Sequence, residues 1–253
     1  MRQRTLGYHG SITDSNWNSM RRLALAFLLL CVSSTGLADS LDGFSYTFRL
    51  YRNGSALGTA DMQYTLKADG FSQFITRSNG TDGVASLAGA GVTETSQLIR
   101  RNGELELVSG RIDTKLAWKR STKSTALQKG AKIYQYSDGK ERRQVPYAPG
   151  LLDQHSLTLA LLEDLRAGKG PQFVYTVIHK GRVETYTFKR VGEQKLDTAL
   201  GKLDTVRIER IRESSDGRST RIYFAKSLDF APVLIQELHS KGDNIEMRAL
   251  SVR

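Results

Sequence analysis

The stretch 44-FSYTFRLYRNGSALGTADMQYTL-66 decides the fold class of this chain. Aromatic and aliphatic side chains occupy every second position from Phe44 to Leu50, and the alternation returns from Ala60 to Leu66. The pair Asn53-Gly54 lies between the two halves. Such a pair is the strongest short signal for a hairpin, because both turn residues must tolerate positive φ. The stretch therefore predicts two antiparallel strands, each with one apolar face.

The same pattern continues along the rest of the chain. Asn102-Gly103, Lys180-Gly181 and Asp216-Gly217 each separate two alternating runs. Such runs number roughly ten to thirteen, at a spacing of about 8–12 residues, which is typical of antiparallel sandwiches and barrels. We therefore expect a mainly β protein, built as a large curved antiparallel sheet or an open barrel.

One segment, 151-LLDQHSLTLALLEDLRAG-168, departs from the strand pattern. After Ser156 its leucines recur at helical spacing, and Gly168 supplies a stop, which predicts one main α-helix over about 154–167. Asp153 is placed as the N-cap of this helix, with its carboxylate accepting from free amides of the first turn. The Ser156 hydroxyl would support the same turn.

Asp153, His155 and Ser156 are also the three residue types of a hydrolase triad. Neighbouring residues of a helix point about 100° apart, so His155 and Ser156 cannot face each other as base and nucleophile. Working triads are assembled from distant parts of a chain. We therefore expect no catalytic residue here. A hydrolase would need a cleft in which Ser156 or another hydroxyl meets a histidine at hydrogen-bond distance.

The N-terminus has the pattern of an export signal. From Met20, two arginines precede an apolar run that ends in small residues, which predicts a signal peptide over 20–38, cut after Ala38. The run is too short to span a bilayer, which needs about 20 apolar residues. Residues 1–19 are interpreted as an upstream extension that is not native, and 39–253 as a single β-rich domain. The expected location is periplasmic.

Charge and cysteine content limit the function classes. The chain carries a formal net charge of +11 and one cysteine, Cys31, which leaves with the predicted signal. The domain can therefore form no disulfide and no Cys-based zinc site. No His-x-His or His-Glu-x-x-His spacing, P-loop or nucleic-acid motif occurs, so we expect no metal, cofactor or nucleic acid. The basic residues fit solvated strand faces or, alternatively, an anionic envelope component such as lipid headgroups.

Aromatic residues recur on the predicted strands. They fit either the filled core of a β protein or the wall of an apolar pocket. Six stand out: Tyr46, Phe48, Trp118, Tyr186, Phe188 and Tyr223.

Several segments together resemble a known family. The opening 44-FSYTFRLYRNGSALG-58, the tryptophan in 115-KLAWKR-120, the helix start 151-LLDQHS-156 and the long segment 196–236 around "DTVRIER" follow one another as in the bacterial family DUF3108, exported proteins of unknown function. Tyr223, where many relatives carry Trp, and Ala231, where Leu is common, depart from its pattern. The resemblance implies a periplasmic location and a mostly antiparallel β fold with a helix, similar to the open barrels of lipoprotein carriers. It supplies no catalytic residues.

Three functions remain open. The first is a non-enzymatic periplasmic protein that binds a lipid or other amphipathic envelope molecule on a curved sheet. The second is an envelope module for protein–protein interaction with a filled core. The third, which the residues favour least, is a hydrolase with a dispersed site.

Overall fold

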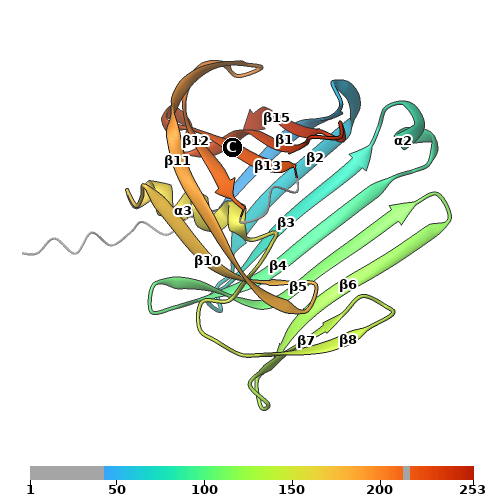
Figure 1. Cartoon of the computed structure of the whole chain (residues 1–253), viewed down its shortest axis with the longest axis vertical. Coiled ribbons are helices and arrows are strands. Elements are labelled where there is room, and N and C mark those ends of the chain that lie inside the picture. The colour runs from blue at the N-terminus through green and yellow to red at the C-terminus, as the bar shows by residue number, and fades with distance from the viewer. Residues whose placement is uncertain (1–42, 213–216) are drawn as a thin grey trace, which may run out of the picture. The chain divides into compact units, whose positions relative to one another are not determined.

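Fifteen strands form one hydrogen-bonded sheet in the computed structural model, which describes residues 43–212 and 217–253 (Figure 1). The order is β8-β7-β6-β5-β4-β3-β2-β1-β15-β14-β13-β12-β11-β10-β9, so most sequence neighbours are also sheet neighbours. The sheet does not close on itself. The extension and signal peptide predicted for residues 1–38 lie outside the described residues.

The strands are β1 (Phe44–Arg52), β2 (Ser55–Leu66), β3 (Phe71–Gly80), β4 (Gly91–Arg101), β5 (Glu104–Leu116), β6 (Lys119–Gln128), β7 (Ile133–Ser137), β8 (Arg142–Pro146), β9 (Leu152–Asp153), β10 (Gln172–His179), β11 (Arg182–Thr198), β12 (Gly201–Ile211), β13 (Arg218–Ala225), β14 (Ala231–His239) and β15 (Ile245–Val252). Two helices, α2 (Gly83–Leu87) and α3 (Leu157–Arg166), and a 3₁₀ turn, η1 (Lys226–Leu228), interrupt them.

The hairpins expected from the Asn-Gly pairs are confirmed. Asn53 and Gly54 have φ values of 50° and 80°, and Arg52 pairs with Ser55 directly beside them. The turn between β4 and β5 repeats this geometry. Positive φ at both turn positions matches the right-handed twist of the flanking strands. A mainly β fold with a curved, open sheet and one main helix is therefore confirmed.

Two strands were not predicted by the alternation. β6 begins with Lys, Arg, Ser and Thr, so neither of its faces carries the apolar repeat that marks a strand. β9 is two residues long and runs parallel to β10, unlike every other pair in the sheet. A parallel pair needs a crossover, and α3 supplies it. The sheet is therefore mixed rather than purely antiparallel.

The first and last strands lie side by side within the sheet. β1 pairs with β15 from Tyr46 opposite Val252 onward. Beyond the ladder, Ser45 and Arg253 exchange two backbone hydrogen bonds of 2.9 and 3.0 Å. The two ends of the described chain are thus fastened to each other.

The hydrophobic core lies between α3 and the inner face of the sheet, which is the face that carries Phe48 and Met62. Helix α3 buries six of its ten residues, and Figure 1 shows it beside β10. These six are Leu157, Leu159, Ala160, Leu161, Leu162 and Leu165. They join the buried side chains of β1, β2 and β10–β14 in one cluster, which also takes in Phe74, Leu98 and Leu107 of β3–β5 and single residues of β7, β8 and β15. This half of the inner face is filled.

The inner face becomes polar toward β3–β6. The ladder places Phe74 opposite Ser96, and Ser96 opposite Gly110. The next row places Thr76 opposite Glu94. Hydroxyl and carboxyl groups therefore stand where β1 and β2 carry aromatic residues. This change of chemistry within one face locates the candidate site.

Candidate functional site

A buried polar cluster forms where β9 and the start of α3 meet the inner face of β3–β5. Asp153 ends β9, and His155 stacks on the Phe74 ring with 4.4 Å between ring centroids. Gly110 makes the approach possible, because a Cβ at this position would collide with Oδ2 of Asp153. The cluster thus depends on the absence of a side chain at Gly110 as well as on its polar side chains.

Four side chains are joined in a chain of hydrogen bonds. The Ser96 hydroxyl donates to the Asp153 carboxylate, at 2.7 Å from Oδ2 and 2.9 Å from Oδ1. The same Ser96 oxygen lies 2.9 Å from Nδ1 of His155. On the other side of the ring, Nε2 of His155 lies 3.0 Å from the Thr76 hydroxyl. Polar side chains therefore link the three strands β3, β4 and β9.

The available protons determine which group donates in each of these hydrogen bonds. A serine hydroxyl has one proton, and a carboxylate only accepts. Since Ser96 gives its proton to Asp153, the contact with His155 requires the proton to sit on Nδ1. Neutral His155 then accepts from Thr76 at Nε2. Every polar group of this hydrogen-bond series then has a partner, without a charge on the His155 imidazole.

This arrangement does not activate a nucleophile. His155 cannot accept a proton from Ser96 through an Nδ1 that already carries one. Ser96 is also fully buried, with no exposed surface. The Ser96 hydroxyl therefore lies at hydrogen-bond distance from a histidine, as a hydrolase would require. However, Nδ1 of His155 already carries a proton, and no substrate can reach the buried hydroxyl.

The electrostatics of His155 agree with the neutral form. Burial lowers the pKa of His155 below its ordinary value, and the carboxylates of Glu94 and Asp153 oppose that effect only in part. Burial penalises a charged imidazole because water no longer solvates it. At neutral pH the His155 ring is therefore neutral.

The N-cap position of α3 lies three residues beyond Asp153, and the side chain there makes no capping hydrogen bond. Helix α3 begins at Leu157, so Ser156 and not Asp153 occupies the N-cap position. Asp153 accepts from the Ser156 amide at 2.9 Å, and the Ser156 hydroxyl donates to the Asp153 carbonyl at 3.1 Å. The two residues close a tight turn ahead of the helix. Asp153 is extended because it belongs to β9, and this moves the helix start.

A small pocket lies directly beside the cluster. It has a volume of about 270 Å³ and is lined by residues of β5–β7, by the segment Asp153–His155 and by the turn between β10 and β11. Ile112, Ile178 and Tyr136 supply apolar wall, and Lys123 and Lys180 are exposed at its margin. The pocket therefore combines an apolar lining with cationic side chains.

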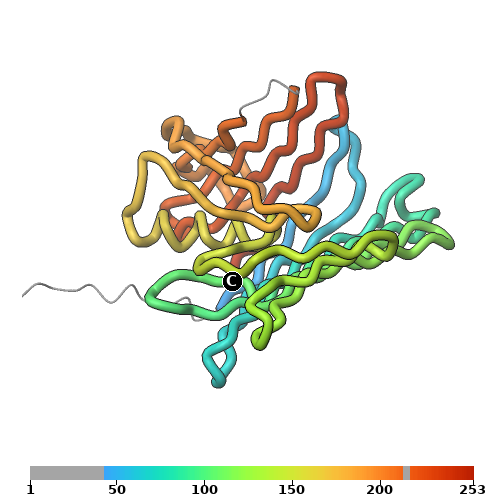
Figure 2. Tube along the Cα trace, turned by 60° about the horizontal axis from the view of Figure 1, so that its bottom comes forward, coloured from blue at the N-terminus to red at the C-terminus, as the bar shows by residue number. Residues whose placement is uncertain are grey.

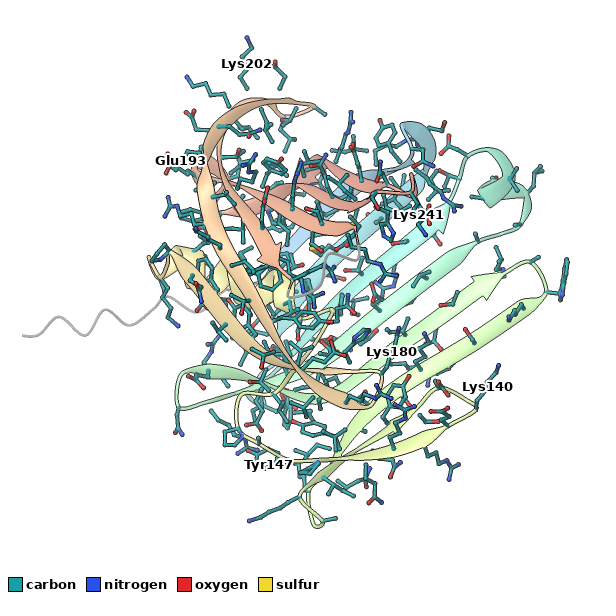
Figure 3. All side chains as sticks on the ribbon, viewed as in Figure 1. Lys140, Tyr147, Lys180, Glu193, Lys202 and Lys241 are labelled. Atoms are coloured by element: carbon teal, nitrogen blue, oxygen red, sulfur yellow. The ribbon has the colours of Figure 1, made fainter. Side chains whose placement is uncertain are left out.

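The turn between β10 and β11 is fixed against the opposite strands. The Arg143 side chain donates to the Lys180 carbonyl at 3.3 Å, and a Cβ at Gly181 would come within 2.7 Å of the Tyr136 ring. Figure 3 shows Lys180 at the end of the β10–β11 hairpin. A second space of about 450 Å³ adjoins the same turn and adds Arg182 and Glu184 to the lining.

The sequence itself settles the family. Residues 45–248 match a family described as "Protein of unknown function (DUF3108)". The chain belongs to the DUF3108 family. The resemblance expected from the sequence is therefore confirmed. No curated protein matches this DUF3108 chain.

Several solved structures are similar to this DUF3108 protein at low sequence identity. A β-barrel-like DUF1849 protein from Brucella abortus is 10% identical, with a TM-score of 0.50, and the match covers 84% of this chain and 97% of that one. The Pseudomonas aeruginosa MucA/MucB complex matches at 15% identity over 85% of this chain and 53% of that chain, with a TM-score of 0.32. A putative exported protein with a YmcC-like fold from Bacteroides fragilis is 8% identical, covering 84% and 96%, with a TM-score of 0.34. The likeness to the DUF1849 protein shows a β-barrel-like fold and nothing of function.

The six aromatic residues singled out in the DUF3108 sequence divide into two groups. Five are buried in the core, with exposed fractions of 5% or less: Tyr46, Phe48, Tyr186, Phe188 and Tyr223. Burial raises the pKa of Tyr46 to about 12. Trp118 is 95% exposed in the turn after β5, so it belongs neither to the core nor to a pocket wall. Its position beyond the end of the ladder explains this difference.

Within residues 43–212 and 217–253, no group of three or more His, Cys, Asp and Glu side chains is placed to hold a metal ion. No helix in the same ranges is long and apolar enough to cross a membrane.

Sequence reasoning did not find Ser96, Thr76 or Gly110. Each lies on a strand whose neighbours are set by pairing across the sheet, and none belongs to a motif. Only the "DQHS" stretch carried a signal, because it placed Asp153 and His155 together. Their hydrogen-bond partners, Ser96 and Thr76, lie on strands more than 50 residues earlier in the chain.

Proposed function

We propose that this protein is a non-enzymatic, exported binding protein of the cell envelope that holds a small amphipathic anion in the pocket beside His155. The single observation that carries the proposal is the composition of that pocket, an apolar wall with two lysines at its margin. Among the described residues, no carboxylate lies within ion-pair distance of Lys123 or Lys180 in the structure. Neither lysine is held in an ion pair with these residues, and the carboxylates of Asp138, Glu141 and Glu184 line the adjoining space.

The size of the pocket narrows the class of ligand. Its volume of about 270 Å³ is near the lower end of the ~300–1,000 Å³ range that small-molecule sites occupy. Much of the inner face elsewhere is filled by α3 and by buried aromatic side chains. A small anion with an apolar part, or the headgroup region of a larger lipid, suits this space better than a pair of acyl chains.

The envelope location rests on the sequence. The arginine pair, the apolar run and the small residues before Asp39 support export, and the family resemblance carries the same implication. Maturation can be tested by exporting the chain from a bacterial host and measuring the mass of the periplasmic product. Cleavage after Ala38 is expected. A product that retains residues 20–38 would contradict this part of the proposal.

Ligand binding can be tested by native mass spectrometry of protein purified from the periplasm. We expect a co-purified anion in the wild-type protein that is lost in Lys123→Glu/Lys180→Glu. The matched control is Lys202→Glu/Lys241→Glu, which makes the same charge change at two exposed positions away from the pocket (Figure 3). Retention of the ligand by the pocket variant, or absence of any ligand from the wild type, would reject the proposal.

One observation favours the alternative of an interaction module. The inner face is filled over β1, β2 and β10–β14, as in a protein that acts through its outer surface. Crosslinking in intact cells tests this alternative. Recovery of one specific protein partner, together with no ligand in the mass spectrum, would favour the interaction module over the binding protein.

A further inference from the structure

Four large apolar side chains are exposed to solvent at one end of the sheet. Val84 and Leu87 of α2 are 82% and 90% exposed, and Leu116 and Trp118 of the β5–β6 turn are 52% and 95% exposed. We call these four residues the apolar tip. The chain has ten such exposed side chains among its described residues, and four of them gather here. Scattered apolar residues are normal at a surface, but a group rimmed by polar residues marks an interaction site.

The two parts of the apolar tip form one surface. The Ala117 amide in the β5–β6 turn donates to the Ala88 carbonyl at the end of α2, at 2.6 Å. The adjoining ladder pairs Gly91 with Lys115. In Figure 2 the β3–β4 connection and the β5–β6 turn project on the same side of the strands. The apolar tip is therefore built from two neighbouring loops that are hydrogen-bonded to each other.

Helix α2 has an orientation opposite to that of an ordinary surface helix. Its small residue Ala85 packs so closely on Gly80 that a Cβ there would lie 2.7 Å from the Ala85 Cβ. Its two large residues, Val84 and Leu87, point outward. Asp82, just before the helix, accepts from the Arg49 side chain at 2.7 Å. A soluble helix normally turns its large apolar side chains toward the core. The fold holds these two in water instead.

Cationic side chains flank the β5–β6 part of the apolar tip. Lys115, Lys119 and Arg120 flank Leu116 and Trp118 in the sequence, and all three are exposed. No described carboxylate pairs with them, and the nearby Asp82 and Asp113 already pair with Arg49 and Arg111. Nearby acids therefore do not cancel the positive charge of this rim.

We propose that the apolar tip docks on the surface of an anionic lipid bilayer. Trp118 and Leu87 would enter the headgroup region, and Lys119 and Arg120 would contact lipid phosphates. Tryptophan favours this interface because its ring is apolar and its N–H is polar. Basic residues beside inserted apolar ones add attraction to anionic lipid. A projecting group of four side chains suits insertion better than it suits a stable protein interface, which needs about 800 Å² per partner. The inference does not depend on what the pocket beside His155 binds.

Co-sedimentation of the mature protein, purified from the periplasm, with lipid vesicles tests the proposal. One set of vesicles contains phosphatidylethanolamine and phosphatidylglycerol, and the other contains phosphatidylcholine alone. We expect binding to the first set and little to the second. Both Leu87→Ser/Trp118→Ala and Lys119→Glu/Arg120→Glu should weaken binding by about tenfold or more. The binding should also weaken at high salt, which screens the headgroup charge.

Two control variants separate the apolar tip from the rest of the surface. Val183→Ser/Val191→Ser removes exposed apolar side chains elsewhere, and Lys140→Glu/Lys241→Glu makes the same charge change elsewhere. Both should bind anionic vesicles as the wild type does. All substituted positions are exposed, and circular dichroism should show that each variant is folded. Equal loss in test and control variants, or no binding by the wild type, would overturn the proposal.

Fluorescence distinguishes insertion from adsorption by charge. In the mature protein, residues 39–253, Trp118 is the only tryptophan of the sequence. Its emission should shift to shorter wavelength on anionic vesicles, because the ring leaves water. Binding without this shift would mean attraction by charge alone, and the docking proposal as stated would be wrong.

Discussion

The hydroxyl of Ser96 lies 2.9 Å from Nδ1 of His155, although 59 positions separate the two residues in the chain. The same hydroxyl donates to Asp153, so a serine in the middle of the sheet joins β4 to the start of the helical crossover. The contact resembles part of a hydrolase triad, but here Nδ1 of His155 donates to the serine instead of accepting its proton. Its consequences are for stability and pH dependence, and both can be measured.

Removal of the Ser96 hydroxyl should destabilise the protein. In Ser96→Ala, the half-buried Asp153 carboxylate loses a donor and the buried Nδ1–H of His155 loses its acceptor. An unsatisfied buried polar group costs about 1–3 kcal/mol, and chemical denaturation should show a loss of this size. The control Ser121→Ala, at an exposed position on β6, should change the free energy of unfolding by less than about 0.5 kcal/mol.

A double-mutant cycle should show that Ser96 and Asp153 act together. Asp153→Ala alone removes the acceptor of both Ser96 and the Ser156 amide. Because both single variants break the same hydrogen bond, the double variant should lose less stability than the sum, by about 0.5–3 kcal/mol. Additive losses would show that the contact contributes nothing, and that Asp153 acts only through the turn before α3.

His155 should make the protein less stable in weak acid. Its pKa is lower in the folded protein than the value of about 6.5 for a free imidazole, so below that pH the unfolded chain binds more protons. Stability from this residue is complete above about pH 6.5, and it falls by up to about 1.4 kcal/mol per pH unit as the pH drops. Denaturation between pH 7.5 and 5 should show this slope.

The same series on His155→Asn should give a flatter curve, since the titrating group is gone. His239→Asn replaces a histidine outside the cluster and should leave the wild-type slope in place. A slope that stays unchanged in His155→Asn would show that other groups cause the acid sensitivity.

Gly110→Ala should be costly even though the new side chain is a single methyl group. Its Cβ would collide with the Asp153 carboxylate, and overpacking of this kind costs about 1–3 kcal/mol. Gly130→Ala is a matched control, because a Cβ at that glycine has nothing within 4 Å. Thermal unfolding of the two variants should separate them clearly. Equal midpoints would mean that β9 can move away from the sheet without cost.

Truncation to alanine should cost much stability at one leucine and almost none at another. Leu161 of α3 is fully buried, and Leu161→Ala should cost about 2–5 kcal/mol because it leaves a cavity in the core. Leu87 of α2 is 90% exposed, and Leu87→Ala should change stability by less than about 0.5 kcal/mol. A large loss at Leu87 would show that α2 packs on another part of the protein.

The sequence predicts those features that depend on neighbouring residues. The Asn53-Gly54 hairpin and the α3 helix follow from local conformational preference and from the period of the apolar residues. β6 does not follow, because its charged and hydroxyl residues carry no such period. The cluster around His155 cannot follow either, since Ser96 and Gly110 face it only after two strands pair and the crossover folds back. Trp118 fits the aromatic pattern of a core, but lies past the end of its ladder.

The pairing of β1 with β15 determines which strand pair forms last during folding. Most other ladders join consecutive strands and can close as hairpins soon after both are available, with little loss of chain entropy. β1 must wait for residues some 200 positions later, so its ladder has by far the longest sequence separation in the sheet. Ser45 and Arg253 already exchange hydrogen bonds, so a short linker between the two ends would make this ladder a local hairpin. The new termini belong between β8 and β9, the two edge strands, because a cut there separates no paired strands. Such a circular permutant should reach the same sheet faster, without any change in its contacts.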